Sequence, residues 1–213
     1  KEHRITLYLP SHFEAGRIAS VELEDGAAIT PHKFDCKVLF FGDSITEGWE
    51  ATWHSLSYAY HVSRFLNAES IIQGIGGAVY HMTTFDEEMA FEPDIVIVAY
   101  GTNDWKNYKT LEEAKEHCCK FLDQLVAKYG DKKLFGISPI WRADNANDTD
   151  MGSFASCVSS IKEEIINHGL ILIDGETLTP RLTDFYSDGY LHPDAKGHGV
   201  YAVNLITQLQ KHL

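Results

Sequence analysis

Short runs of large and β-branched apolar residues alternate along the chain with longer stretches in which apolar residues recur every three or four positions. Continuous apolar runs are typical of strands that are covered on both faces, as in a parallel sheet. The pattern predicts five strands, over residues 37–41, 69–73, 94–100, 132–137 and 170–174. Strands that alternate with amphipathic helices indicate an α/β protein, so we expect a three-layer α/β/α sandwich around a five-stranded parallel sheet.

Helix signals support the same arrangement. The clearest helix is predicted over residues 110–129, where Thr110 and Glu113 form a capping box and Gly130 is expected to be a left-handed stop. Two further helices are predicted over residues 153–168 and 194–213. The second of these is expected to close the domain.

The first 35 residues follow a different pattern. Ile5, Leu7 and Leu9 alternate with polar or aromatic residues, and apolar positions from Ile18 to Leu23 suggest a second strand. We expect residues 1–35 to form a β-hairpin extension or the end of an upstream β-domain, and residues 36–213 to form the α/β domain.

Composition narrows the possible functions. The 213 residues contain 31 acidic and 18 basic side chains, and the resulting charge of −13 disfavours binding to nucleic acid or to anionic membrane surfaces. The longest apolar run, residues 95–100, is far shorter than the ~20 residues of a membrane span. No signal-peptide pattern opens the chain, which begins at Lys1, so both a cytoplasmic and a secreted location remain open. Oligomeric state is equally open.

Candidate chemistry lies in the loops that follow the strands, because ligands of open parallel sheets bind at the carboxyl ends of the strands. The loop at residues 42–49 lacks the Lys of a phosphate-binding P-loop and has Thr46 where a G-x-S-x-G nucleophile elbow requires Gly. The loop at residues 74–77 has Val79 where a dinucleotide-binding G-x-G-x-x-G motif requires its last Gly. These patterns disfavour nucleotide binding and an ordinary α/β-hydrolase.

Acyl transfer explains the remaining loop residues. A Ser hydroxyl becomes a nucleophile when an imidazole removes its proton, and the reaction intermediate needs donors aimed at its oxyanion. Ser44 and His192 are the candidates for the first pair. The backbone N–H groups of Ser44 and Gly77 and the side-chain amide of Asn103 are the candidate oxyanion donors.

These residues resemble the SGNH hydrolases, also called the GDSL esterase/lipase family, over about residues 36–213. The matching blocks are GDSIT at residues 42–46, Gly77, GTND at residues 101–104 and LHPDAKGH at residues 191–198. The resemblance implies nucleophile Ser44, oxyanion donors Gly77 and Asn103, and base His192. It also implies a flavodoxin-like sheet with strand order 2-1-3-4-5.

One position departs from the family pattern. The family places an orienting Asp three residues before the His, where this chain has Gly189, while Asp188 lies four residues before His192. We expect Asp188 to orient the imidazole through a looser turn. The alternative is a backbone carbonyl, as the resemblance implies for carbohydrate esterases that work with a Ser-His dyad.

Other polar and aromatic residues have weaker assignments. Asp43 and Asp104 are expected to hold their loops through local hydrogen bonds. Neither a zinc motif nor an EF-hand calcium loop is present, and we expect no metal and no organic cofactor. Five residues near strand ends are candidates to line a substrate pocket, with Arg142 a candidate for an anionic group: Trp49, Tyr80, Trp105, Trp141 and Arg142.

The sequence therefore favours a serine esterase that hydrolyses small-molecule or carbohydrate esters of short acyl chains through an acyl-enzyme, with O-acetyl groups on carbohydrates as one candidate substrate. The second enzymatic hypothesis is a lipolytic acylhydrolase that acts on lysophospholipid or platelet-activating-factor-like esters. A flavodoxin-like flavin-binding protein and a catalytically silent carbohydrate-binding module are the non-enzymatic alternatives.

Overall fold

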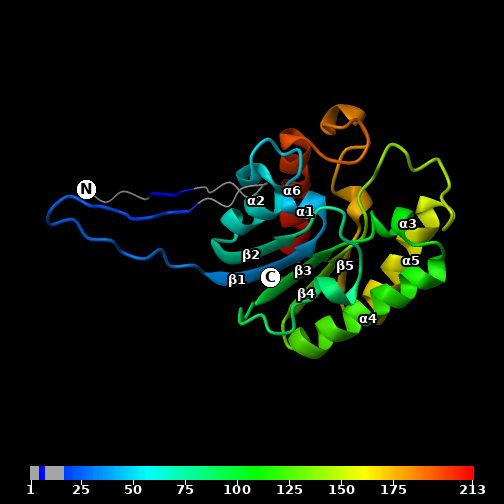
Figure 1. The fold of residues 1–213 in the computed structure, drawn as a ribbon, viewed down its shortest axis with the longest axis horizontal. Helices are drawn as coiled ribbons and strands as arrows, with labels where there is room; N and C mark the ends of the chain where they lie inside the picture. The colour runs from blue at the N-terminus through cyan, green and yellow to red at the C-terminus, as the bar shows by residue number, and fades with distance from the viewer. Residues whose placement is uncertain (1–4, 8–16) are drawn as a thin grey trace.

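A single parallel sheet organises the chain. The computed structural model describes residues 5–7 and 17–213. Its strands are β1 (Cys36–Gly42), β2 (Ala68–Gly74), β3 (Ile95–Ala99), β4 (Lys133–Ile137) and β5 (Ile171–Ile173), hydrogen-bonded in the order β2-β1-β3-β4-β5. All neighbouring pairs are parallel. The predicted five-stranded α/β fold and its strand order are confirmed (Figure 1).

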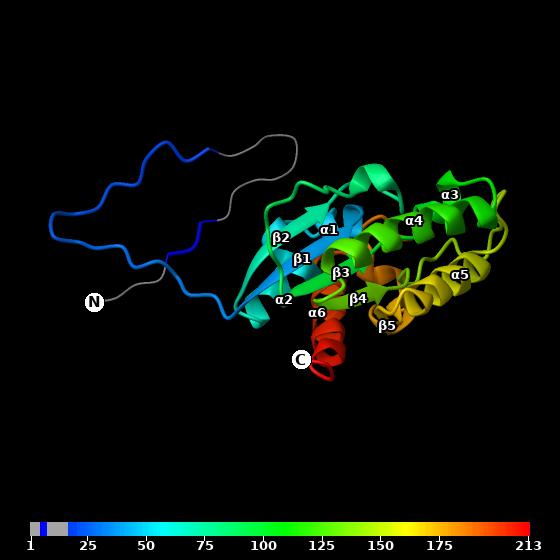
Figure 2. The same cartoon turned by 90° about the horizontal axis from the view of Figure 1, so that it is seen from below.

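Helices cover both faces of the sheet (Figures 1 and 2). The α-helices are α1 (Ser44–Glu47), α2 (Tyr58–Phe65), α3 (Asp104–Asn107), α4 (Leu111–Tyr129), α5 (Phe154–Asn167) and α6 (Ala195–Leu209). Short 3-10 turns are η1 (His54–Leu56), η2 (Met82–Thr84), η3 (Gly175–Thr177) and η4 (Thr183–Phe185). Within residues 5–7 and 17–213, no helix is both long and apolar enough to cross a membrane.

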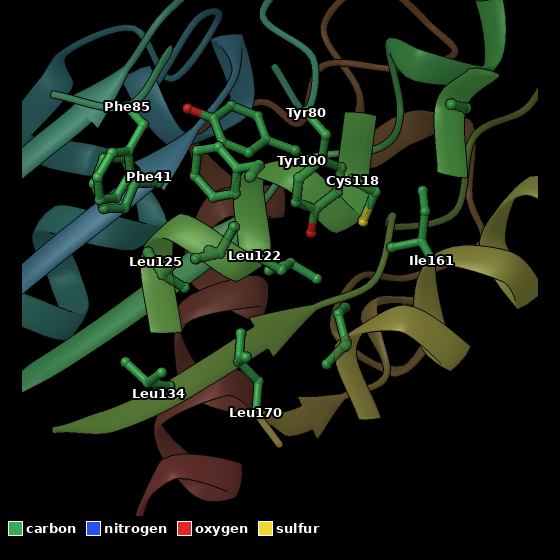
Figure 3. Close-up of a cluster of buried hydrophobic side chains, with 14 of the residues drawn as sticks. Phe41, Tyr80, Phe85, Tyr100, Cys118, Leu122, Leu125, Leu134, Ile161 and Leu170 are labelled. Carbon is green, nitrogen blue, oxygen red and sulfur yellow. The ribbon is translucent and has the colours of Figure 1, made fainter. Parts of the chain in front are cut away.

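The core is divided between the two faces of the sheet. Leu39 and Phe41 of β1 pack in the cluster that contains the buried residues of α4 and α5 (Figure 3). Val38 and Phe40 point the other way, into the cluster that contains the buried residues of α2 and α6. Successive strand residues are thus buried on opposite faces, which explains the continuous apolar run in the sequence.

Helix α4 begins as predicted and ends differently. The hydroxyl of Thr110 accepts a hydrogen bond from the Glu113 N–H at 3.1 Å, as expected for a capping box. Gly130 has φ −64°, so the prediction of a left-handed stop is wrong. The chain instead turns through a Lys132 N–H to Tyr129 carbonyl hydrogen bond of 2.9 Å, which needs no left-handed residue.

The predicted N-terminal strands are not present in the described part of the extension. Residues 5–7 and 17–35 form no strand, and Ile18, Val21 and Leu23 are exposed. The rest of the first predicted strand, including Leu9, lies outside the described residues. Residues 17–35 extend away from the sheet (Figures 1 and 2), and no strand within residues 5–7 and 17–213 pairs with them, so alternation alone does not produce a strand here. An upstream β-domain stays a prediction.

Candidate active site

The turn that carries Ser44 lies tightly against the sheet. Strand β1 ends at Gly42 and α1 begins at Ser44, with the Asp43 carboxylate accepting a hydrogen bond from the Ile45 N–H at 2.9 Å. A Cβ atom on Gly42 would lie 1.9 Å from the Thr46 hydroxyl oxygen, so a side chain there would push α1 off the sheet. Glycine at this position therefore lets the chain turn sharply and place Ser44 above the carboxyl end of β1.

Three side chains form a connected hydrogen-bond chain. The Ser44 Oγ and His192 Nε2 atoms are 2.9 Å apart, although 148 residues separate them in sequence. On the other side of the ring, His192 Nδ1 lies 2.7 Å from Asp188 Oδ2. A carboxylate at Nδ1 holds the proton on that nitrogen and leaves Nε2 as an acceptor for the serine proton.

Asp188 is itself held by the backbone of its own loop. Its Oδ1 atom accepts hydrogen bonds from the N–H groups of Tyr190 (3.0 Å), Leu191 (2.8 Å) and His192 (3.0 Å). Gly189 has φ +76°, a left-handed conformation that lets the loop fold around the carboxylate. Burial alone would raise the pKa of Asp188, but these N–H groups and the His192 imidazole outweigh it and lower that pKa. The extra residue between Asp188 and His192 is thus accommodated by a local turn.

Two of the three candidate oxyanion donors, Gly77 and Asn103, occupy neighbouring loops. The Ile75 N–H donates to the Gly42 carbonyl at 3.0 Å, which attaches the loop after β2 to the end of β1. Asn103 Nδ2 donates to the Ala78 carbonyl at 3.0 Å, which attaches the loop after β3 to the loop after β2. Gly77 has φ +76° and is exposed. The structure therefore places Gly77 and Asn103 in adjoining loops, with one amide hydrogen of Asn103 directed to Ala78 and the other available to a ligand.

Two buried carboxyl groups lie next to these loops. Asp43 is 2% exposed and Asp104 is 1% exposed, and burial raises the pKa of each to about 7. Asp104 Oδ1 accepts a hydrogen bond from the Tyr80 N–H at 3.1 Å, while its Oδ2 has no hydrogen-bond partner among the described residues. Both side chains hold backbone groups of their own or adjoining loops, as expected from the sequence.

Three of the five expected pocket residues are buried. Tyr80, Trp105 and Arg142 are at most 1% exposed, so they do not line an open pocket, contrary to expectation. Trp49 and Trp141 are half-buried.

Arg142 is buried because partners on the loops satisfy its charge and its donors. Its Nη1 donates to the Thr102 carbonyl at 2.9 Å and its Nε to Asp144 Oδ1 at 2.6 Å, with the guanidinium carbon 4.9 Å from the centre of the Trp105 ring. Thr102 precedes Asn103, so Arg142 fixes the loop of a candidate oxyanion donor. It does not face a substrate.

Two further contacts support the candidate triad and have no motif in the sequence. Ser187 Oγ donates to Glu50 Oε2 at 2.8 Å, and the Ser187 N–H donates to the His192 carbonyl at 2.9 Å. This bridge joins the loop after α1 to the loop that carries Asp188 and His192. Its partners come from segments 137 residues apart, so no local spacing could indicate it.

The second His of the LHPDAKGH block, His198, lies inside the protein and has a structural role. His198 is fully buried in α6, and its Nδ1 accepts a hydrogen bond from the Tyr58 N–H at 3.2 Å. Burial lowers the pKa of His198 to about 4, so the ring is neutral near pH 7. The Tyr58 and Thr46 hydroxyls are 2.7 Å apart, which links α6 through α2 to the helix that begins with Ser44.

Comparison with known proteins decides the family. Residues 40–200 match the sequence model of the GDSL-like Lipase/Acylhydrolase family, which is well over half of the chain. The chain belongs to this family. As a member of the GDSL-like lipase/acylhydrolase family, it is an ester hydrolase. A search of curated proteins found no match.

Solved structures with the same fold include lipases and carbohydrate esterases. The lipase/acylhydrolase from Enterococcus faecalis is 21% identical, covers 84% of this chain and 97% of its own, and has a TM-score of 0.68. An acetyl-xylooligosaccharide esterase from Geobacillus is 20% identical, with coverages of 83% and 94% and a TM-score of 0.65. A family two carbohydrate esterase from Clostridium thermocellum, in complex with cellohexaose, is 17% identical, with coverages of 86% and 66% and a TM-score of 0.66.

Proposed function

We propose that the protein is a serine esterase in which Ser44, His192 and Asp188 form the catalytic triad. The observation that carries this proposal is the continuous contact from Ser44 Oγ to His192 Nε2 (2.9 Å) and from His192 Nδ1 to Asp188 Oδ2 (2.7 Å). His192 takes the hydroxyl proton as Ser44 attacks the ester carbonyl, then returns it to the leaving alcohol. Water resolves the acyl-enzyme with the same imidazole as base.

The negative charge on the carbonyl oxygen requires hydrogen-bond donors. We assign this role to the backbone N–H groups of Ser44 and Gly77 and to Asn103 Nδ2. Ser44 is the first residue of α1, where backbone N–H groups have no carbonyl partner within the helix. Asn103 is held in place by the Ala78 carbonyl, and its loop is held by Arg142. Fixed donors of this kind stabilise the developing charge without reorganisation.

The preferred substrate in this proposal is a short-chain ester, in particular an O-acetyl group on a carbohydrate. Tyr190, which lies between Asp188 and His192 in the sequence, is 38% exposed, and an exposed aromatic ring of this kind can stack on a sugar. The similarity to carbohydrate esterases agrees with this choice.

Substrate comparison tests the proposal. We expect kcat/KM for p-nitrophenyl acetate to exceed that for the octanoate by about 10-fold or more, because the proposed site is specific for a short acyl chain. Acetate release from acetylated xylooligosaccharides should proceed at a comparable kcat/KM. Ser44→Ala should abolish turnover of every ester, while Ser159→Ala, an exposed serine of α5, serves as the matched control.

Each other outcome indicates a different function. A preference for octanoyl or lysophospholipid esters that is lost in Ser44→Ala would replace the short-chain substrate with a lipolytic one and leave the triad intact. Wild-type activity in Ser44→Ala would refute the mechanism. A yellow protein with bound flavin, or oligosaccharide binding without any hydrolysis, would indicate one of the non-enzymatic alternatives.

A further inference from the structure

A group of metal-ligating side chains lies between two helices outside the candidate active site. Helices α4 and α5 lie side by side on one face of the sheet (Figure 2). Cys119 and Asp123 are one helical turn apart on α4, and Glu164 and His168 are one turn apart at the end of α5. The two pairs face each other across the helix interface.

The distances within this group are close to those of a coordination site. Ligand atoms of Cys119, Glu164 and His168 all lie within 4.8 Å of one another. Cys119 Sγ is 2.9 Å from Glu164 Oε2, and His168 Nε2 is 3.5 Å from Asp123 Oδ1. Around a tetrahedral zinc ion, bonds of about 2.0–2.3 Å separate ligand atoms by roughly 3.3–3.8 Å. Asp123 lies outside this group of three, but 75% of its side chain is exposed, so it can rotate toward the other ligands and complete the site.

We propose that Cys119, Asp123, Glu164 and His168 bind one divalent transition-metal ion, Zn²⁺, which clamps α4 to α5. A thiolate, an imidazole and two carboxylates suit zinc better than the all-oxygen ions calcium and magnesium. Binding replaces the thiol proton of Cys119 with the metal, and that proton goes to solvent. No electron transfer or other reactant is needed.

The orientation of His168 is consistent with this role. Its Nδ1 lies 2.7 Å from the Glu164 carbonyl oxygen and donates to it. Metal-binding histidines commonly donate their second ring N–H to a backbone carbonyl, because this fixes the ring and leaves the other nitrogen with a lone pair. The Nε2 atom of His168 is therefore the available ligand, and it is the atom nearest Asp123.

Glu164 is a buried carboxylate that already has a cationic neighbour. Only 5% of its side chain is exposed, and Lys115 Nζ lies 2.9 Å from its Oε1. The other oxygen, Oε2, faces Cys119 and remains available to an ion. Lys115 is 43% exposed and lies 3.8 Å from Glu163 as well, so it can shift to Glu163 when a metal binds. Lys115 weakens metal binding through charge repulsion, and Lys115→Gln should tighten it.

The proposed clamp lies away from the hydrolytic chemistry. His168 caps the end of α5 just before β5 begins, which places it near the amino ends of the strands. Ser44 follows the carboxyl end of β1, at the opposite edge of the sheet. The ion would stabilise the helix pair and would not contact an ester.

Cobalt absorption provides a direct test, because Co²⁺ bound by a thiolate gives a charge-transfer band in the near ultraviolet and intense visible bands when tetrahedral. The full chain without a histidine tag is titrated with Co²⁺, and Zn²⁺ is then added as competitor. We expect saturation at one equivalent and displacement by Zn²⁺. Cys119→Ser should remove the charge-transfer band, and His168→Gln, which removes a ligand, should lower the affinity by more than about 10-fold. Cys36→Ser, at a half-buried cysteine in β1, is the matched control.

Esterase activity of each variant reports whether it is folded, since none of these residues contacts the candidate triad. Zn²⁺ at 100 times its Kd should raise the Tm of the wild type by about 5–10 °C, and a chelator should reverse the shift. The same Zn²⁺ should leave the Tm of Cys119→Ser unchanged. Absence of a thiolate band in active wild-type protein, or an unchanged band in active Cys119→Ser, would overturn the proposal.

Discussion

Replacing the Asp188 carboxylate with an amide should place the His192 proton on the wrong nitrogen. In Asp188→Asn, the oxygen of the new side chain is expected to keep the three backbone hydrogen bonds that Oδ1 accepts from residues 190–192. Its NH₂ group then faces His192 Nδ1, where the carboxylate Oδ2 lies in the wild type. Nδ1 must accept, so Nε2 carries the proton and cannot take one from Ser44.

The structure sets the size of this effect. Turning the amide over would point its NH₂ at three N–H donors and lose three hydrogen bonds, each worth about 1 kcal/mol. About 3 kcal/mol corresponds to fewer than roughly one molecule in 100 with a usable tautomer. We therefore expect kcat to fall at least about 10²-fold and up to about 10⁴-fold, the loss known when a triad carboxylate becomes an amide.

Initial rates with p-nitrophenyl acetate measure this loss, with Asp184→Asn, an exposed Asp of η4, as the matched control. Asp188→Ala leaves the His192 imidazole free to carry its proton on either nitrogen, so this variant should lose no more activity than Asp188→Asn. If Asp188→Asn keeps a kcat within about 10-fold of wild type while folded, the assigned role of Asp188 is incorrect.

Three other predictions follow from the loops around Ser44. Asn103→Ala should lower kcat by about 10²- to 10³-fold with little change in Tm, because it removes one oxyanion donor. The control Asn107→Ala, at an exposed position on α3, should keep full activity. Equal rates for the two variants would show that Asn103 is not an oxyanion donor. Gly77→Ala should lower the free energy of unfolding by about 1–2 kcal/mol, because φ +76° disfavours a side chain. The control Gly199→Ala in α6 should leave the free energy of unfolding equal or raise it by up to about 1 kcal/mol. Denaturant unfolding measures both, and a Gly77→Ala variant as stable as wild type would contradict the assigned backbone strain. Burial raises the pKa of Asp104 to about 7 in the folded protein, above 3.8, so the folded state holds its proton between these values and loses stability as pH rises through them. Asp104→Asn removes this loss, so its free energy of unfolding relative to wild type should be higher at about pH 8 than at about pH 5, by on the order of 2–4 kcal/mol. Denaturant unfolding at both pH values measures this, and a difference that does not change with pH would contradict the raised pKa of Asp104.

Sequence patterns predicted the sheet because its signals are local. Strand β1 reads as an unbroken apolar run, and its residues are buried on both faces, so the pattern and the packing agree. The Ser44 and His192 loops were identified for the same reason, since each follows or precedes an element with a clear period. In contrast, the alternation at residues 5–7 and 18–23 lacks a partner strand among the described residues, and only pairing makes such a pattern a strand.

Sequence patterns did not predict the properties that depend on contacts between residues far apart in the chain or on backbone conformation. The sequence predicted that Arg142 could bind an anionic group, but its guanidinium instead donates hydrogen bonds to Asp144 and the Thr102 carbonyl inside the protein. The reach of Asp188 to His192 depends on the positive φ of Gly189, which residue spacing does not reveal. Cys119 and Glu164 meet across 45 residues of sequence, so the proposed metal site has no linear motif.

Covalent labelling tests the central claim most directly. A fluorophosphonate reacts with a serine hydroxyl only when a neighbouring base activates it, and tandem mass spectrometry locates the adduct. We expect a single adduct on Ser44, absent in Ser44→Ala and formed far more slowly in His192→Ala. No adduct on active protein, or an adduct on another serine that accounts for the loss of activity, would contradict the assignment of Ser44 as the nucleophile.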